Sequence, residues 1–141
     1  MRAAAVVLAI FGAACAVQAG PRQPEAQLFA AHDCCGRLLQ SEIAKVGEMR
    51  SGRRTFRIYS LWFVNPQSLH GMRRIALTEG NEFRGSYIIS SSAMPVVQNG
   101  IVKFVCDNGA ACESDDFAIK DGKLPSELWV DGEVHQLENT I

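Results

Sequence analysis

The sequence lacks the short motifs that mark the common catalytic and nucleotide-binding sites. It contains no G-x-S-x-G nucleophile elbow, no H-E-x-x-H zinc motif, no phosphate-binding P-loop and no Rossmann glycine pattern. These absences argue against the elbow-type serine hydrolases, the H-E-x-x-H metalloproteases, the P-loop nucleotidases and the dinucleotide-dependent oxidoreductases. A Ser–His–acid site is defined by geometry in space and leaves no fixed motif, so an unrecognised hydrolase stays an alternative.

Histidine is scarce, and none of the three residues lies in a metal-binding or catalytic pattern. We expect His32, His70 and His135 to be surface or hydrogen-bonded structural residues. The run 32–35 (HDCC) lacks the C-x-x-C spacing with which two thiolates reach one ion. The acidic residues of 107–116 do not fit the D-x-[DN]-x-[DN]-G calcium loop. The sequence therefore predicts no metal, no cofactor and no enzymatic activity.

Long apolar runs are absent after the first residues of the chain. Residues 3–14 are apolar or small, follow the positive charge of Arg2 and lead into a small-x-small end. This combination defines a secretory signal peptide, whereas a membrane span takes about 20 apolar residues. We expect residues 1–19 to be a signal peptide, residues 20–141 to be one exported domain, periplasmic or secreted, and the chain to have no membrane span.

Cys15 raises one alternative, which is a lipid anchor at this cysteine. A cysteine after small residues is a lipid attachment site in bacterial lipoproteins, and the lipid would hold the N-terminus at a membrane. The residue three positions earlier is Gly12 rather than the leucine that such sites usually carry. We therefore favour simple cleavage over lipidation.

The net charge is close to zero, which argues against a nucleic-acid partner. The charges are unevenly distributed along the chain. Residues 20–106 carry eleven Lys and Arg against six Asp and Glu, whereas residues 107–141 carry two against nine. We favour the interpretation that both parts lie together in one fold and their charges intermix. The alternative is a domain that presents an acidic face to a basic partner.

The pattern of residues 24–48 predicts an amphipathic helix. Pro24 suits the first helical position, and Gly47 is a natural stop. Between them, apolar residues recur at steps of three and four, which places them in one stripe that must pack on another element. The stripe consists of Leu28, Ala31, Cys35, Leu38, Leu39, Ile43 and Val46.

After Gly52 the pattern becomes that of β-strands. Residues 55–64 are rich in β-branched and aromatic types, with Phe56, Ile58, Trp62 and Val64 on one face and Tyr59, Leu61 and Phe63 on the other. Apolar residues on both faces predict burial on both faces. Turn-forming pairs such as Asn99-Gly100 separate the further strands, which we expect at 72–78, 83–90, 96–98, 101–106, 117–120, 123–124, 128–130 and 133–137.

The predicted fold class is mainly β (α+β). The N-terminal amphipathic helix packs on an antiparallel β-meander of about eight strands, which forms a small barrel or a sandwich.

Cysteine is sparse but suggests disulfides, because residues 20–141 hold four cysteines in a predicted export context. Cys106 and Cys112 flank a short turn that can bring them together. Neighbouring cysteines on a helix point about 100° apart and do not pair without distortion. Either Cys106 pairs with Cys112, or Cys34 and Cys35 cross to them and tie the helix to the sheet.

These observations favour a non-enzymatic binding or accessory domain that engages another protein. Candidate contacts lie in the basic segment 50–57, the loop 65–71 and the acidic loop 107–116. The individual candidates are Arg50, Arg53, Arg54, Arg57, His70, Asp115 and Asp116.

Two further alternatives stay open beside this hypothesis and the unrecognised hydrolase. The first is a carrier of a small apolar ligand, with a cavity inside a barrel. The second is an inhibitor or immunity protein of an exported enzyme. The aromatic residues that would line the carrier's cavity, and that otherwise form plain core, are Phe56, Trp62, Phe83, Tyr87, Phe104 and Trp129.

Overall fold

The structure, a computed structural model, describes residues 24–34, 38, 43–64, 67–89 and 92–141. The signal-peptide and Cys15 predictions lie outside these residues. No helix in the described ranges is long and apolar enough to cross a membrane. The elements are α1 (Pro24–His32), β1 (Ile43–Ser51), β2 (Arg54–Val64), β3 (Gly71–Glu79), β4 (Glu82–Ile89), β5 (Met94–Gln98), β6 (Ile101–Val105), β7 (Glu127–Val130) and β8 (Glu133–Gln136).

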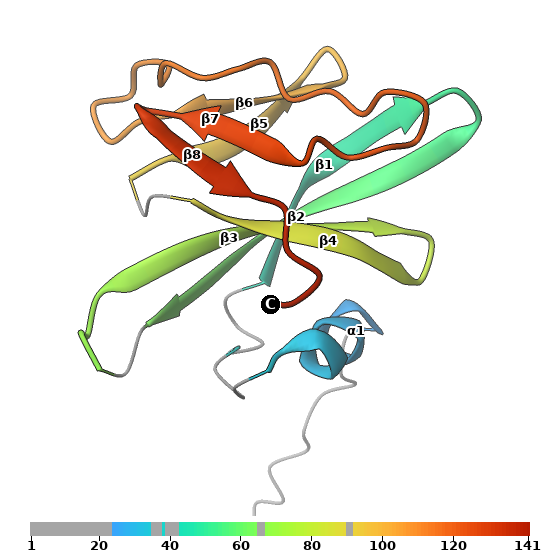
Figure 1. The fold of residues 1–141 in the computed structure, drawn as a ribbon, viewed down its shortest axis with the longest axis horizontal. Coiled ribbons are helices and arrows are strands. Elements are labelled where there is room, and N and C mark those ends of the chain that lie inside the picture. The colour runs from blue at the N-terminus through green and yellow to red at the C-terminus, as the bar shows by residue number, and fades with distance from the viewer. Residues whose placement is uncertain (1–23, 35–37, 39–42, 65–66, 90–91) are drawn as a thin grey trace, which may run out of the picture.

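The strands form one antiparallel four-stranded sheet and two hairpins (Figure 1). The sheet has the order β1-β2-β3-β4, and β5-β6 and β7-β8 pair separately. The hairpin β5-β6 approaches β1, and β8 approaches β4. Ser86 of β4 exchanges two backbone hydrogen bonds with Glu138, of 2.9 and 2.8 Å. Within the described residues the strands do not close into a barrel, so that part of the prediction is not met.

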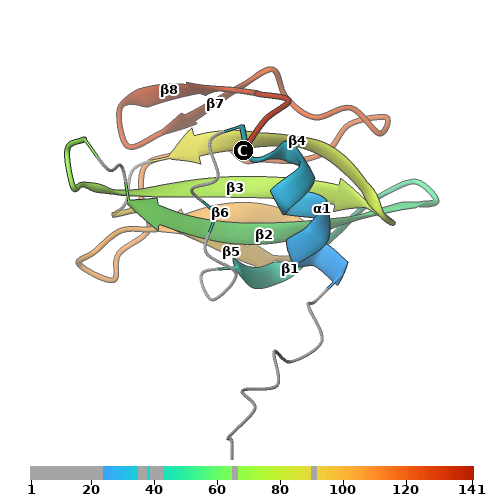
Figure 2. The same cartoon turned by 90° about the horizontal axis from the view of Figure 1, so that it is seen from below.

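The sheet separates two apolar clusters, so the molecule has three layers. The larger cluster lies between the sheet and the two hairpins and contains Phe56, Ile58 and Tyr87. The smaller cluster lies on the other face, where α1 crosses the sheet (Figure 2), and contains Phe29 and Tyr59. The mainly β prediction is confirmed, and the short helix α1 packs on one face of the sheet through Phe29.

The prediction of one helix over 24–48 is wrong in its extent. The helix ends at His32, and residues 43–51 are strand β1, which pairs with β2 from Ile43↔Leu61 to Ser51↔Arg54. Pairing along a whole strand overrides a helical spacing of apolar residues, because the spacing is only a local preference. Cys35 and Leu39 of the predicted stripe lie outside the described residues.

Gly47 has a different role from the predicted helix stop. It lies at a register shift between β1 and β2, next to Val46. A Cβ atom at position 47 would lie 2.8 Å from the Cγ2 atom of Val97 in β5. The glycine therefore lets the hairpin β5-β6 approach the sheet closely.

The stripe that the helix buries also differs from the predicted one. Ala26 and Phe29 are buried, whereas Leu28 is half-buried and Ala31 is exposed. The anchoring residue is Phe29, whose ring lies edge to face against Tyr59, with centroids 5.0 Å apart. An aromatic side chain contributes the largest apolar area on this helix, so it decides which face docks.

Strand β2 agrees with its prediction. It runs from Arg54 to Val64, and its two faces contribute to the two clusters, Ile58 to the larger and Leu61 to the smaller. Val64, at its end, is exposed rather than buried. The predicted strands 117–120 and 123–124 are reduced to isolated bridges, Val102↔Phe117 and Lys120↔Lys123.

The disulfide joins Cys106 to Cys112, with Cα atoms 5.2 Å apart. The first of the two predicted pairings is confirmed, and the cross-tie from Cys34 and Cys35 to these residues is excluded. Cys34 is exposed at the end of α1, and Cys35 lies outside the described residues. A structural disulfide is typical of proteins in oxidising compartments.

Candidate functional site

The end of the β2–β3 hairpin carries an exposed apolar residue in a strained conformation. We call Val64 and residues 67–71 the β2–β3 tip. Leu69 in this tip has φ 56° and a side chain that is 79% exposed. A left-handed backbone conformation costs a non-glycine residue about 1–2 kcal/mol. Such outliers cluster at functional sites, where strain is retained for a purpose.

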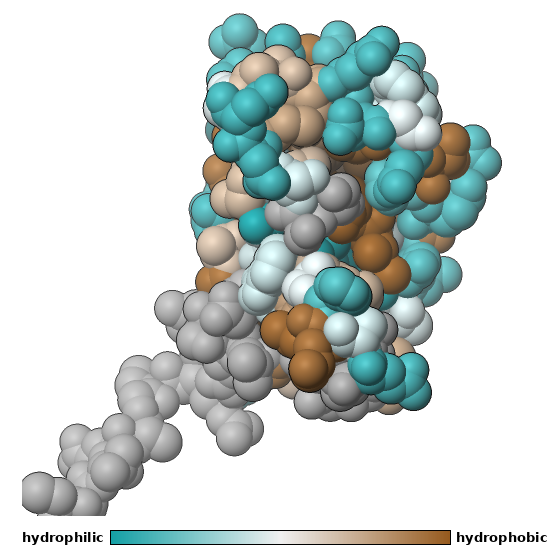
Figure 3. All heavy atoms as spheres, turned by 90° about the vertical axis from the view of Figure 1, so that its left-hand side faces the viewer, coloured by the Kyte–Doolittle hydropathy of each residue, from teal (hydrophilic) through white to brown (hydrophobic). Residues whose placement is uncertain are grey.

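The β2–β3 tip combines this leucine with a second exposed apolar residue and with polar neighbours. Val64 is 47% exposed, and Ser68 and His70 are exposed as well. The Ser68 hydroxyl accepts a weak hydrogen bond of 3.4 Å from the His70 amide. Figure 3 shows this end of the molecule, with apolar atoms among polar ones. Of the predicted contacts, His70 is therefore available to a partner.

The predicted basic loop is a β-hairpin, formed by the end of β1 and the start of β2 at the opposite end of β2 from the tip. Arg50 and Arg53 are exposed. Arg57 lies half-buried with its Nε atom 3.8 Å from an oxygen of Glu48. The four arginines therefore differ in how far they are available to a partner.

The Arg54 side chain forms hydrogen bonds within the protein, to Glu79 and Gly122. Its guanidinium donates to both carboxylate oxygens of Glu79 and, at 3.1 Å, to the carbonyl oxygen of Gly122. The hydrogen bond to Glu79 raises the pKa of Arg54 and lowers that of Glu79. The Arg54 side chain is nevertheless 39% exposed, so its role as a partner contact stays a prediction.

The acidic residues Asp115 and Asp116 are exposed and line a hollow of about 600 Å³ together with Lys120 and Lys123. Their place in the fold is set by backbone bonds to β7, because the Asp115 amide donates to the Trp129 carbonyl at 3.1 Å. Asp121 and Glu127 line the same hollow, so four carboxyl groups face two lysines there. All of these residues belong to 107–141, so the hollow keeps the acidic character of that part of the chain.

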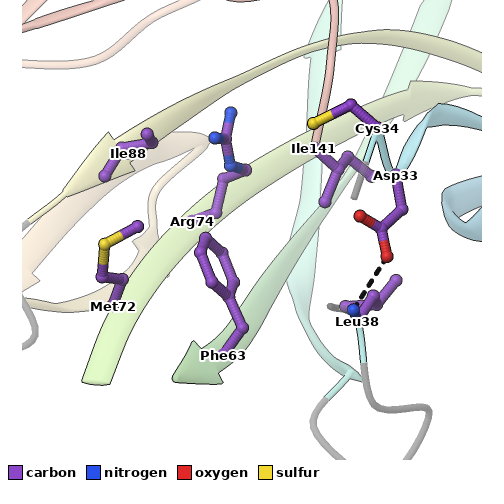
Figure 4. A pocket seen from close by; sticks show the side chains of 8 residues that line it. All are labelled: Asp33, Cys34, Leu38, Phe63, Met72, Arg74, Ile88 and Ile141. Atoms are coloured by element: carbon purple, nitrogen blue, oxygen red, sulfur yellow. Dashed lines mark hydrogen bonds between the residues drawn. The ribbon is translucent and has the colours of Figure 1, made fainter. Parts of the chain in front are cut away.

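A pocket that is partly open to solvent lies on the α1 side of the sheet (Figure 4). It has a volume of about 140 Å³. Its floor comes from β2, β3 and β4, and its wall from the end of α1, from residue 38 and from the chain's last residue. The lining residues are Asp33, Cys34, Leu38, Phe63, Met72, Arg74, Ile88 and Ile141.

Among the described residues that line the pocket, Arg74 is the only arginine or lysine, and it is only 6% exposed. Its Nη1 atom donates to the Ser86 hydroxyl at 2.9 Å, to a Glu138 carboxylate oxygen at 2.6 Å and to the Thr140 carbonyl at 3.0 Å. Its Nε atom is buried and has no hydrogen-bond partner among the described residues. An unsatisfied buried donor costs about 1–3 kcal/mol and calls for an explanation.

The six aromatic residues considered for a carrier cavity do not line one space. Phe56, Tyr87 and Phe104 belong to the larger cluster, whereas Phe83 packs on the opposite side of the sheet against the smaller one. The Trp62 ring lies against the Arg73 guanidinium, 5.2 Å from its centroid. Trp129 is half-buried. These residues therefore do not enclose one cavity, and Phe56, Tyr87 and Phe104 are core residues.

The histidines lie on three different segments, with His32 at the end of α1, His70 in the β2–β3 tip and His135 on β8. The His32 ring lies 4.4 Å from the Phe83 ring on the α1 side. His135 is buried on β8, and its Nε2 atom has no hydrogen-bond partner in the described part of the chain. Within the described ranges no group of three or more His, Cys, Asp and Glu side chains could hold a metal ion.

Sequence reasoning missed both Leu69 and Arg74. Leu69 carries no local sign of its left-handed backbone, because leucine is not a residue that favours this conformation. Arg74 could have been noticed, since it interrupts an apolar strand pattern between Met72 and Ile75, and a charge in a buried strand needs a partner.

The comparisons with known proteins give no relative on which a function could be based. No family model, no curated protein and no solved structure matches this chain.

Proposed function

We propose that this chain is a non-enzymatic, exported binding domain that engages another protein through the β2–β3 tip. The observation that carries the proposal is Leu69, a large apolar side chain that is 79% exposed at φ 56°. The folded chain gains little from this side chain, because it is almost fully in water, yet the backbone there is strained. A partner that buries Leu69 would account for both features.

The shape of the tip supports a cleft or groove as its target. The tip connects β2 and β3, which pair through Val64↔Gly71, so the sheet holds its base in place. A rigid base reduces the ordering cost that a contact loop incurs on binding. An apolar side chain presented in this way suits insertion into an apolar pocket of a partner, with His70 and Ser68 at the polar rim.

Export is part of the proposal. The Cys106–Cys112 disulfide is of the kind that persists in oxidising compartments, and it agrees with the secretory signal expected from residues 1–19 of the sequence. We also propose that the protein is periplasmic or secreted and that it has no enzymatic activity.

The test compares capture by two matched surface variants. Leu69→Asp and Met94→Asp each replace an exposed apolar residue, and Met94 lies on β5, outside the tip, and is 46% exposed. Immobilised wild-type protein and both variants are incubated with the extracytoplasmic fraction of the source cells, and the bound proteins are identified. We expect at least one protein that the wild type and Met94→Asp retain and that Leu69→Asp loses by tenfold or more.

The proposal fails if every protein retained by the wild type is also retained by Leu69→Asp. A photo-crosslinking residue at position 69 gives an independent readout, because it labels only what contacts the tip. The same residue at position 94 on β5, another exposed apolar position, is the control.

A further inference from the structure

We propose that the groove between the end of β4 and β8 binds an extended segment of the partner protein as an added β-strand. The groove has a volume of about 430 Å³ and is lined by the first two residues of β3, the last two of β4, strand β8 and Glu138. Gly71 also belongs to the β2–β3 tip, so the groove adjoins the contact proposed there. The segment belongs to the partner that the tip engages, and in this respect the proposal rests on the proposed function.

The backbone pairing between β4 and the chain after β8 stops after one residue pair. Ser86 and Glu138 exchange hydrogen bonds of 2.9 and 2.8 Å. Continued antiparallel pairing would join Ile88 to Gln136 in the same way, further along each strand. Among the residues that the structure describes, no backbone hydrogen bond joins these two. The two strands therefore separate at this point, as Figure 1 shows, and the groove occupies the space between them.

The separated strands leave backbone donors and acceptors directed toward the groove. In an antiparallel strand the N–H and C=O groups of every second residue point to the same side. Ser86 directs its groups away from β3, so Ile88 does the same. Leu137 donates its amide to the carbonyl just before β7, so Gln136 and Val134 direct theirs away from β7. Such a row of backbone groups is a template for another strand, and strand addition is a recurring mode of peptide recognition.

The apolar side chains at the groove share one face. Ile88 lies opposite Arg74 in the sheet, and Met72 is two residues from Arg74, so both share its face. Glu138 also reaches Arg74, at 2.6 Å, and Val134 lies four residues before Glu138, which places it on the same face. Val134 is 57% exposed, and the other two are half-buried. Apolar residues at alternate positions of an added strand can therefore contact all three and bury Val134.

The charges of the groove favour a basic segment. Among the described residues that line it, the only Asp, Glu, Lys or Arg residues are Glu133 and Glu138. Glu138 is paired with Arg74, whereas Glu133 is exposed and forms no ion pair with any described residue. Glu133 precedes Val134 and therefore faces the other side of an added strand, where a lysine or arginine would meet it. The segment that fits the groove alternates apolar with basic residues.

A second copy of this chain fits the groove less well than a basic partner. Strand β8 of the copy has the sequence EVHQ, which brings another Glu133 and no lysine or arginine. Residues 107–141 as a whole carry nine Asp and Glu against two Lys and Arg. Like charges opposite each other destabilise a strand pair, so pairing between two copies of β8 is disfavoured.

The probe is the capped peptide acetyl-Val-Lys-Val-Lys-Val-amide, titrated into isotope-labelled protein near neutral pH. We expect the amide signals of Ile88, Val134 and Gln136 to shift along one saturable curve. The amide protons of Val134 and Gln136 should also exchange more slowly with solvent, because they then donate to peptide carbonyls.

Two control peptides separate charge from backbone pairing. The first has glutamate in place of each lysine. The second carries methyl groups on its backbone nitrogens, so it keeps every side chain and loses the N–H donors that pair with a strand edge. Each control should bind about tenfold more weakly than the lysine peptide, a difference of about 1.4 kcal/mol.

Two variants test the charge of the groove. Glu133→Lys is matched by Glu82→Lys, which makes the same change at the exposed first residue of β4, outside the groove lining. Glu133→Lys should reverse the preference, so that the glutamate peptide binds more tightly than the lysine peptide, and Glu82→Lys should leave the preference unchanged. The proposal is overturned if the lysine peptide gives no saturable shifts, if its methylated form binds equally well, or if Glu133→Lys keeps the wild-type preference.

The variant Leu69→Asp separates strand addition from the contact proposed for the tip. Leu69 is not among the residues that line the groove, so this variant should bind the lysine peptide as the wild type does. Absence of peptide binding in a protein that captures its partner through Leu69 overturns strand addition alone. Peptide binding by a wild type whose captured proteins are all retained by Leu69→Asp overturns the tip contact alone.

Discussion

Phe29 of α1 and Tyr59 of β2 meet edge to face, with ring centroids 5.0 Å apart and planes at 74°. Phe29 is fully buried, and the Tyr59 hydroxyl donates to a Glu25 carboxylate oxygen at 3.3 Å. Burial is the main cause that raises the pKa of Tyr59, and the charge of Glu25 adds to it. A helix of nine residues is not stable alone in water, so α1 depends on this contact for its existence.

Truncation of this ring should release the helix from the sheet. We expect Phe29→Ala to lower the free energy of unfolding by about 3 kcal/mol, since it removes a fully buried aromatic side chain. Hydrogen exchange should show loss of protection in α1, while β2 and β3 keep theirs. Phe29→Leu, the conservative control, should cost less than half as much. A loss below about 1 kcal/mol for Phe29→Ala would contradict the anchoring role.

The extent of this helix shows where sequence reasoning reached its limit. Strand β2 could be predicted, because its apolar residues occupy consecutive positions and its composition is that of a strand. The segment from Ile43 to Ser51 could not, because the helical spacing of Ile43 and Val46 gives no information about the partner strand that pairs with it. Pairing over eight residue pairs is a tertiary effect, and it outweighs the local preference.

The candidate site was less predictable than the fold. His70 stays a predicted contact, named because it lies in a loop between two expected strands, whereas Cys106–Cys112 was one of the two pairings that the cysteine positions left open and is the one present. The three acceptors on Arg74 come from distant parts of the chain, Glu138 being 64 residues away in sequence. Such relationships depend on topology, which composition and spacing do not encode.

The Cys106–Cys112 disulfide should contribute measurably to stability. It closes a loop with a sequence separation of six, and the loop-closure entropy of so short a loop corresponds to about 2 kcal/mol. We expect the double variant Cys106→Ser, Cys112→Ser to have a free energy of unfolding lower by that amount, measured by urea denaturation. Its stability should no longer respond to a reductant, whereas that of the wild type should fall. Equal free energies of unfolding for the double variant and the wild type without reductant would refute this prediction.

The strain at Leu69 gives a prediction that separates stability from binding. Glycine adopts φ 56° without steric cost. The free energy of unfolding of Leu69→Gly should therefore equal that of the wild type or exceed it by up to about 1 kcal/mol. The same variant should lose the partner that the wild type captures. Leu69→Ala, which keeps the strain, should lose the partner with no gain in stability. A clear loss of stability in Leu69→Gly would mean that the side chain serves the fold.

The ion pair between Arg54 and Glu79 predicts a defined pH dependence. The hydrogen bond from Arg54 lowers the pKa of Glu79 from its ordinary value of 4.5. A carboxyl group whose pKa is lower in the folded state stabilises the fold above its unfolded pKa, and the contribution is lost as the pH falls through the folded pKa. The difference in unfolding free energy between wild type and Arg54→Gln should therefore be largest near neutral pH and shrink below about pH 4.5.

The check on this pair is a titration of the Glu79 carboxyl carbon by NMR. Its midpoint should lie below 4.5 in the wild type and return toward 4.5 in Arg54→Gln. Arg53→Gln is the matched control. Arg53 is the neighbouring exposed arginine, and its substitution removes the same charge from the same hairpin. If both variants shift the midpoint equally, the effect is long-range attraction, which salt screens, and the hydrogen bond is not its cause.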